Sequence, residues 1–161
     1  MSSSLHRSGS IDLDDLDWQR RPYSATGAYA ASKLANLLFT LELQRRLGAA
    51  GSRVRALAAH PGYAATNLQA HTGSRVSGGV MKLGNLLLAQ SDERGALPTL
   101  AAATRDLPGS SYLGPDGFQE MRGYPTLVGR TATASDPVLA RRLWEASALL
   151  TGVDYPAVAT A

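Results

Sequence analysis

The sequence predicts an α/β fold, and three observations support this. A long amphipathic helix is predicted over residues 28–47, a short buried strand follows over 53–60, and a well-capped helix begins near Ser135 or Asp136. A helix, a glycine-containing turn and a strand make half of a β-α-β unit. The 161 residues suit one domain, which at this length removes roughly two thirds of its unfolded surface from water. We therefore expect a single domain over residues 1–161.

The composition limits the classes of function. Apolar residues make up 44% and charged residues 18%, as in globular proteins, and the excess arginines are scattered without interleaved aromatic residues, which favours solvated surface over a nucleic-acid patch. The absence of cysteine excludes disulfides, thiolate metal sites and thiol nucleophiles. No apolar run approaches the ~18 residues of a spanning helix, and the N-terminus has no signal-peptide core. We expect no membrane span and a cytoplasmic protein.

The 28–47 helix is indicated by periodicity. Leucines at 34, 37, 38 and 41 follow the i, i+3, i+4, i+7 spacing of one helix face, and Gly48 follows the last turn. The next run, "RVRALAAH" over residues 53–60, is small and apolar and ends at Pro61, which fits a buried strand. Before the helix, residues 11–18 do not have the spacing of a calcium loop and are interpreted as an irregular surface segment with tucked apolar side chains.

The pattern loosens between residues 63 and 90, where glycines separate apolar residues. A mobile segment over an apolar pocket would have this pattern, and so would ordinary packing. Ser91 is a helix cap followed by Asp92, and this helix should carry Leu97 and Leu100 inward. Residues 110–115 are a candidate short strand, and residues 116–125 are rich in turn formers.

The last helix is expected to start at Pro137 and to stop at Gly152. Its apolar residues Leu139, Leu143 and Leu150 lie along one predicted side.

Tyr29 and Lys33 stand one helical turn apart, so their side chains share a face. A tyrosine with its ordinary pKa of about 10 exchanges protons poorly at neutral pH. A nearby ammonium favours the phenolate, which acid–base chemistry at a carbonyl or alcohol oxygen requires. Such a pair also occurs by chance on many helices, and by itself it is weak support for catalysis.

Several motifs strengthen the catalytic interpretation. They are "MSSSLHRSG" at residues 1–9, "GAYAASKLANLLF" at 27–39, "HPGYAAT" at 60–66, "YLGPDGFQEMRGYP" at 112–125 and "LARRLWEASALLTGV" at 139–153. In this order they resemble the C-terminal portion of the short-chain dehydrogenase/reductase family, in the branch of retinol dehydrogenases and protochlorophyllide reductases. The resemblance implies part of a Rossmann-type doubly wound parallel sheet, an apolar alcohol or ketone substrate, and NADP or NAD as cofactor.

The resemblance also implies roles for individual residues. Tyr29 would be the general acid or base on the substrate oxygen. Lys33 would favour the phenolate form of Tyr29 and would hold the ribose of the cofactor. Both residues would therefore contact the cofactor. Ser3 would hydrogen-bond the substrate oxygen, because the branch pattern Ser-Ser-x-x-His places the second serine three residues before the histidine, here His6.

Further residues would border the nicotinamide and phosphate side of the cofactor, namely Pro61, Gly62 and Thr66. We interpret His60 as a hydrogen-bonded histidine at a strand end and not as a catalytic one. No metal site is expected.

The sequence departs from the family at the phosphate-binding end. A dinucleotide fold needs a glycine-rich turn between its first strand and first helix. "TGSRVSGG" at residues 72–79 imitates that turn, but its spacing is one residue too long and no buried strand precedes it, so we interpret it as a lid loop. We expect the N-terminal cofactor-binding half to be absent. The partial domain would keep the catalytic helix, the last strands, the substrate lid and the C-terminal helix, and would bind cofactor weakly or not at all.

Two functions therefore stay open. The first is a truncated NAD(P)-dependent oxidoreductase. The second is a non-enzymatic remnant or interaction module, pairing with itself as a homodimer or with another dehydrogenase subunit through the 28–47 helix. A serine hydrolase is excluded because the chain has no Gly-x-Ser-x-Gly motif.

Overall fold

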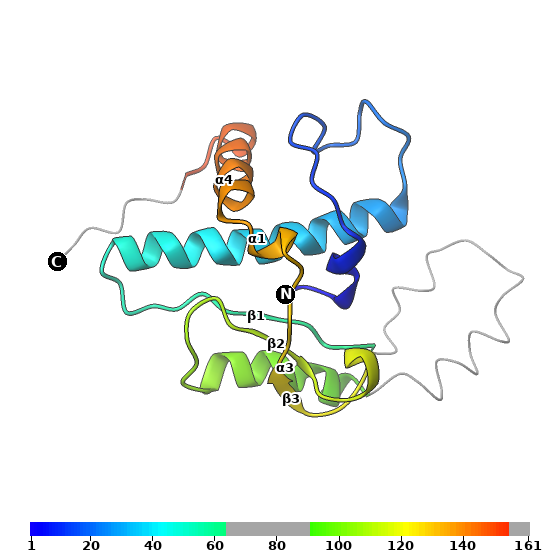
Figure 1. Cartoon of the computed structure of the whole chain (residues 1–161), viewed down its shortest axis with the longest axis vertical. Coiled ribbons are helices and arrows are strands. Elements are labelled where there is room, and N and C mark those ends of the chain that lie inside the picture. The colour runs from blue at the N-terminus through cyan, green and yellow to red at the C-terminus, as the bar shows by residue number, and fades with distance from the viewer. Residues whose placement is uncertain (64–90, 155–161) are drawn as a thin grey trace, which may run out of the picture.

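The computed structural model describes residues 1–63 and 91–154 (Figure 1). The candidate Thr66, the 72–79 loop and most of the segment interpreted as a lid lie outside the described residues.

The described elements form a layered α/β arrangement (Figure 1). Their bounds are α1 Ala25–Ala49, β1 Ala58–Ala59, α3 Asp92–Thr104, β2 Tyr112–Pro115, β3 Pro125–Leu127 and α4 Pro137–Thr151, with short 3-10 helices η1 Ser4–Ser8, η3 Phe118–Glu120 and η4 Thr133–Ser135. The sheet lies between α1 and α3, and α4 packs on α1 on the side away from the sheet. Among the described helices, none combines the length and the apolar character that crossing a membrane requires.

In residues 1–63 and 91–154, three strands form a sheet in the order β1-β2-β3. β1 and β2 are parallel, with Ala58 opposite Tyr112, as expected for a strand that follows a crossover. β3 is antiparallel to β2, because the turn-rich excursion after β2 reverses the chain. The sheet is therefore mixed, and its parallel part is the β1–β2 pair. The predicted strand over 53–60 is regular only near its C-terminal end, at Ala58–Ala59, although backbone hydrogen bonds to the β2 segment run from Ala56 to His60.

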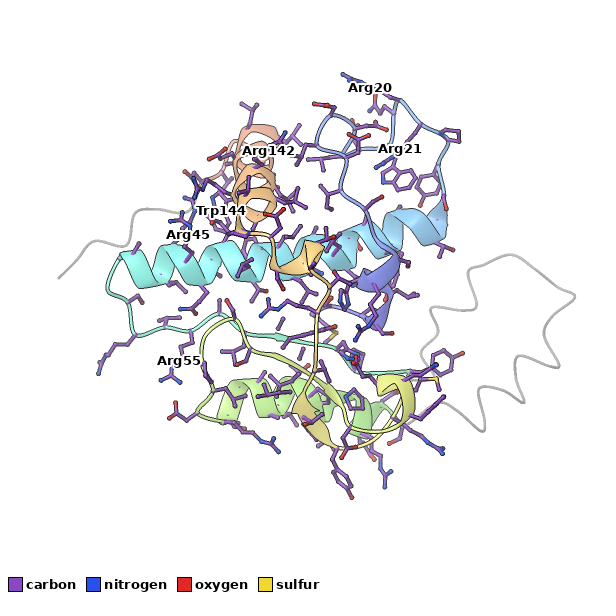
Figure 2. The ribbon with its side chains drawn as sticks, in the orientation of Figure 1. Arg20, Arg21, Arg45, Arg55, Arg142 and Trp144 are labelled. Atoms are coloured by element: carbon purple, nitrogen blue, oxygen red, sulfur yellow. The ribbon has the colours of Figure 1, made fainter. Side chains whose placement is uncertain are left out.

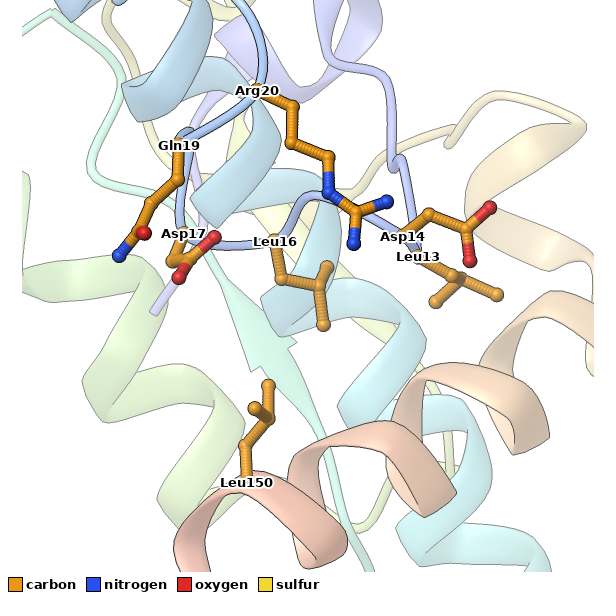
Figure 3. A pocket seen from close by; sticks show the side chains of 7 residues that line it. All are labelled: Leu13, Asp14, Leu16, Asp17, Gln19, Arg20 and Leu150. Carbon is orange, nitrogen blue, oxygen red and sulfur yellow. The ribbon is translucent and has the colours of Figure 1, made fainter.

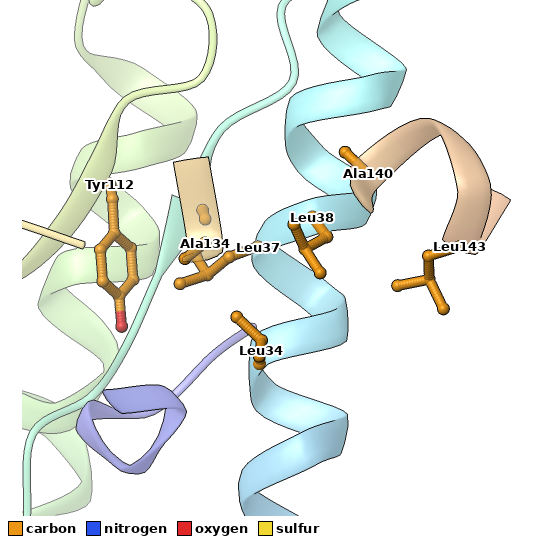
Figure 4. Close-up of a cluster of buried hydrophobic side chains, with 8 residues drawn as sticks. Leu34, Leu37, Leu38, Tyr112, Ala134, Ala140 and Leu143 are labelled. Atoms are coloured by element: carbon orange, nitrogen blue, oxygen red, sulfur yellow. The ribbon is translucent and has the colours of Figure 1, made fainter. Parts of the chain in front are cut away.

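The core gathers on the sheet face that α1 covers. Leu34, Leu37 and Leu38 are 0% exposed, which confirms the apolar face that the periodicity predicted. They pack against Ala58, Tyr112, Ala134, Ala140 and Leu143 (Figure 4). Side chains alternate along the strands, so Ala59 and Leu113 face the other way and pack with Ala101 of α3. Within the described part of the chain, the sheet thus has α1 on one face and α3 on the other.

Two leucines predicted to point inward are exposed. Leu100 is 55% exposed, because α3 approaches the sheet with the small or short side chains Gly95, Pro98 and Ala101. Leu150 is 71% exposed, because α4 contacts the core through its first turns and its last turn extends past α1. Leu150 instead borders a surface groove of about 250 Å³ with the loop that precedes α1 (Figure 3).

That loop is irregular, as predicted, and Ile11, Leu13 and Leu16 pack against the core. Asp15 is buried within it and accepts hydrogen bonds from the backbone N–H groups of the two residues at 19 and 20. The guanidinium of Arg21, which is labelled in Figure 2, lies 3.9 Å from the centroid of the Trp18 ring in the same loop. The acidic loop is therefore fixed by its own polar groups.

Candidate active site

The first turns of α1 carry Tyr29 and Lys33. Ser24 caps the helix, since its Oγ accepts a hydrogen bond from the Gly27 N–H at 3.2 Å. Lys33 Nζ lies 5.1 Å from the centroid of the Tyr29 ring, and both side chains are half-buried. The two groups therefore share one face of the helix, with the ammonium over the aromatic ring.

The N-terminal serines lie against the same helix. Ser2 is buried, its Oγ donates to the carbonyl oxygen of Lys33 at 2.8 Å, and its N–H donates to the carbonyl oxygen of Ala59 at 2.8 Å. Ser2 thus ties α1 to β1. Ser3, the candidate, is half-buried and caps η1, with its Oγ accepting from the Leu5 N–H at 3.3 Å. A hydroxyl that accepts this bond still has its own proton to donate.

The Pro61–Gly62 turn follows directly after β1. Gly62 has a φ of 71°, in the left-handed region that favours glycine, and a Cβ there would lie 2.5 Å from the Met121 carbonyl oxygen. The Tyr63 N–H donates to that same oxygen at 2.7 Å. The turn is therefore held beneath the η3 segment, at the carboxyl end of β1 where ligands bind in open α/β sheets.

A buried polar cluster fills the space between η1 and the strands. The ring of Tyr112 lies between two histidines, with centroid distances of 5.6 Å to His6 and 5.2 Å to His60. Burial lowers the pKa of both histidines below its ordinary value of 6.5. Burial also raises the pKa of Tyr112 to about 12, so this phenol keeps its proton at physiological pH and is unsuited to proton transfer.

His60 is fully buried and hydrogen-bonded, in agreement with the interpretation of a satisfied histidine. Its partner Glu120 and the arginine that Glu120 binds, Arg7, were not predicted as part of the site. No sequence signal identifies them, because Glu120 lies in a turn-rich segment without periodicity and meets His60 across 60 positions of chain.

The structure thus describes five of the six predicted residues, all but Thr66, on α1, beside η1 or directly after β1. Tyr29 and Lys33 lie on α1, Ser3 lies next to the serine that binds Lys33, and Gly62 follows β1 together with Pro61. Two hydroxyls and an ammonium are hydrogen-bond donors suited to a ribose and a carbonyl oxygen.

Comparison with known proteins gives relatives but no matching family model. The chain is 42% identical to human retinol dehydrogenase 13 over 164 aligned residues, covering 98% of this chain and 46% of that protein. It is 37% identical to mouse polyprenol dehydrogenase, covering 94% of this chain and 43% of that protein. An uncharacterized protein of solved structure from Mycobacterium paratuberculosis shares 46% identity with a TM-score of 0.75, over 96% of this chain and 50% of that one.

The chain spans about half the length of these relatives. The residues that carry the resemblance lie within the aligned part, which is the C-terminal portion of the relatives. The 161-residue chain is thus homologous to the C-terminal part of retinol dehydrogenases in the short-chain dehydrogenase/reductase family.

Proposed function

We propose that this chain carries the acid–base side of an NAD(P)-dependent oxidoreductase site that interconverts an apolar alcohol and its carbonyl compound. The observation that carries the proposal is the Lys33 ammonium 5.1 Å from the Tyr29 ring, on the helix that packs against the Ser3 segment. The names of the relatives, retinol and polyprenol dehydrogenases, support an apolar alcohol as substrate.

In the direction of reduction, the Tyr29 phenol donates its proton to the substrate oxygen as a hydride reaches the carbonyl carbon. The Lys33 ammonium stabilises the phenolate left behind. The Ser3 hydroxyl donates a hydrogen bond to the substrate oxygen and so holds it within reach of the phenol. In oxidation the phenolate takes the hydroxyl proton instead. The bound nicotinamide supplies or accepts the hydride.

The same residues would hold the cofactor at its nicotinamide end. Lys33 would hydrogen-bond the ribose hydroxyls, and the Pro61–Gly62 turn and Thr66 would border the nicotinamide and its phosphate. A Rossmann-type fold binds the pyrophosphate at a glycine-rich turn, which these 161 residues do not contain. Binding of NADP or NAD by this chain alone is therefore expected to be weak.

The test is the substitution Tyr29→Phe, which removes only the phenol oxygen. Retinol and a polyprenol are assayed with NAD and NADP, using the chain alone and together with a separately expressed glycine-turn half from a matched relative. Turnover should fall at least ~100-fold, the lower bound for losing a positioned acid–base group. Tyr23→Phe is the control, since this tyrosine is exposed on the preceding loop and should keep full turnover. Retained turnover in Tyr29→Phe would remove Tyr29 from the mechanism.

One observation favours the second candidate, self-association through the 28–47 helix. Phe39 of α1 is 48% exposed and stacks on Trp144 of α4 at 5.1 Å, beside a groove of about 210 Å³. A half-exposed aromatic ring at the edge of a partly apolar groove can receive a side chain of a second copy. Light scattering should show a dimer of this chain that Phe39→Ser dissociates and Leu149→Ser, at an exposed leucine on α4, does not. A monomer at all concentrations contradicts this candidate.

A further inference from the structure

The His60 imidazole connects the turn after β1 to two other segments. The Gly62 N–H donates to His60 Nδ1 at 3.2 Å, and His60 Nε2 lies 3.1 Å from Glu120 Oε2. Because a backbone N–H can only donate, Nδ1 is the acceptor, and the ring proton is on Nε2, directed at the carboxylate. Glu120 Oε1 accepts from Arg7 Nη2 at 2.7 Å. The hydrogen bonds therefore run without a gap from Gly62 to Arg7.

The surrounding backbone makes room for this connection. A Cβ at Gly114 of β2 would overlap His60 Nε2, so the glycine opens the space that the imidazole occupies. Gln119 and Glu120 have φ angles of 51° and 58°, which are uncommon for residues with a side chain. Backbone of this kind persists only where surrounding contacts hold it, and it gathers at functional sites. Here it belongs to the segment that delivers the carboxylate to His60.

The charged and titratable groups facing His60 come from three packed elements. They are Glu120 of η3, His6 and Arg7 of η1, and Tyr112 of β2. Burial lowers the pKa of His60, Glu120 opposes that shift, and His6 and Arg7 add to it. The imidazole is therefore neutral at physiological pH, the form that can accept the Gly62 hydrogen bond.

We propose that His60, Glu120 and Arg7 are positioning residues that hold the Pro61–Gly62 turn in fixed register with the η1 segment that carries Ser3. The inference rests on the proposed function for its consequence, because the turn would border the cofactor and Ser3 the substrate oxygen. Neutral His60 accepts the Gly62 N–H and fixes the turn. Protonated His60 has no acceptor at Nδ1, so the turn is released.

Nuclear magnetic resonance on the 161-residue chain without cofactor tests the geometry directly. The imidazole nitrogens of His60 should report the neutral Nε2–H form at pH 7.5. The protection of the Gly62 amide proton, taken relative to its intrinsic exchange rate at each pH, should fall about tenfold once His60 is protonated, as loss of one part-buried hydrogen bond implies. An Nδ1–H form at pH 7.5, or a Gly62 amide whose exchange ignores the titration of His60, overturns the proposal.

A matched pair of variants separates positioning from simple packing. His60→Asn keeps an acceptor near the Nδ1 position, and His60→Gln keeps a donor near the Nε2 position. His60→Asn should retain Gly62 protection within about twofold, whereas His60→Gln should lose it by about tenfold. If the two variants change the exchange of Gly62 equally, His60 has only a packing role and the proposal is wrong.

The two outer members of the connection have their own readouts. Glu120→Gln should lower the pKa of His60 further, since the carboxylate raises it. Arg7→Gln should loosen the contact between η1 and η3 and speed amide exchange at residues 119–121, whereas Arg53→Gln, at an exposed arginine before β1, should not. If Glu120→Gln leaves the pKa of His60 unchanged, the hydrogen bond between His60 and Glu120 is contradicted.

In an active assembly, His60→Gln should raise KM for the cofactor more than it lowers kcat, because the turn positions the cofactor and takes no proton. This readout also separates the two proposals. Retained turnover in Tyr29→Phe would overturn the proposed function and leave the amide measurements standing. A Gly62 amide whose exchange does not change when His60 is protonated would overturn the positioning role of His60 and leave the proposed role of Tyr29 unaffected.

Discussion

The guanidinium of Arg46 lies 4.5 Å from the centroid of the Trp144 ring, and this contact joins the last turns of α1 to α4. The same side chain donates through Nε to Glu42 Oε1 at 2.8 Å. Glu42 is 1% exposed and also receives two hydrogen bonds from Arg45. A buried carboxylate with several charge-assisted hydrogen bonds is well satisfied. Arg46 therefore both binds the Glu42 carboxylate and contacts the Trp144 ring of α4.

Arg46→Met should therefore lower the free energy of unfolding by about 1–3 kcal/mol, since it removes a cation–π contact and a hydrogen bond to a buried charge. Arg142→Met on the exposed side of α4 is the control and should change it by less than about 0.5 kcal/mol. Urea denaturation followed by circular dichroism measures both. Equal stabilities for the two variants would show that the Arg46 contacts do not contribute.

Glu42→Gln tests the charge of that carboxylate. The hydrogen bond from Arg45 is the largest cause that holds the pKa of Glu42 below its ordinary value of 4.5. A depressed carboxyl pKa stabilises the fold above the unfolded pKa, and that contribution is lost as pH falls through the folded pKa. The variant should therefore be less stable than the natural chain at pH 7, and the difference should shrink below about pH 4.5. A difference that stays constant with pH would contradict the assignment.

Gly62→Ala should destabilise the chain more than Gly51→Ala. Both glycines have positive φ, at 71° and 66°, so both substitutions cost the strain of a left-handed residue, about 1 kcal/mol. A Cβ at Gly51 meets nothing within 4 Å, whereas one at Gly62 would lie 2.5 Å from the Met121 carbonyl oxygen. Thermal denaturation of both variants isolates the steric part, and equal melting temperatures would contradict the tight turn.

Leu37→Ala should lower the free energy of unfolding by about 2–5 kcal/mol, because Leu37 is completely buried between α1 and the sheet. Leu100→Ala, at a leucine of α3 that is more than half exposed, should lower it by less than about 1 kcal/mol. Chemical denaturation measures both values. The comparison distinguishes Leu37, on the buried face of α1, from Leu100 on α3, which the sequence predicted to point inward and which is exposed.

The parts of the fold that were predictable have local causes. The leucine spacing that buries Leu34 and Leu37, the cap expected at Ser135 or Asp136 and the stop at Gly152 each depend on one local segment. The structure confirms them, with Asp136 as the cap. Leu100 was predicted wrongly because the buried face of α3 depends on how closely the sheet approaches, which its own sequence does not report.

The candidate site divides in the same way. The pairing of Tyr29 with Lys33 follows from helical spacing within one segment, and the structure places Lys33 Nζ near the ring as that spacing requires. The contact between His60 and Glu120 joins residues 60 positions apart through a turn whose backbone angles are unusual. Composition and periodicity carry no information about such a contact, so it could not be predicted.

Because α1 is long, a small tilt at one of its ends displaces the other end by a large distance. From Leu47 to Tyr29 the helix runs about 27 Å at its standard rise, and its last turns are held by α4 while its first turns carry the candidate acid–base pair. A tilt of about 5° at the α4 end would move Tyr29 by about 2 Å, and displacements of 1 Å can cost about 100-fold in rate. Substitutions at Trp144 or Arg46, far from the chemistry, would then behave in kinetic assays as active-site mutations.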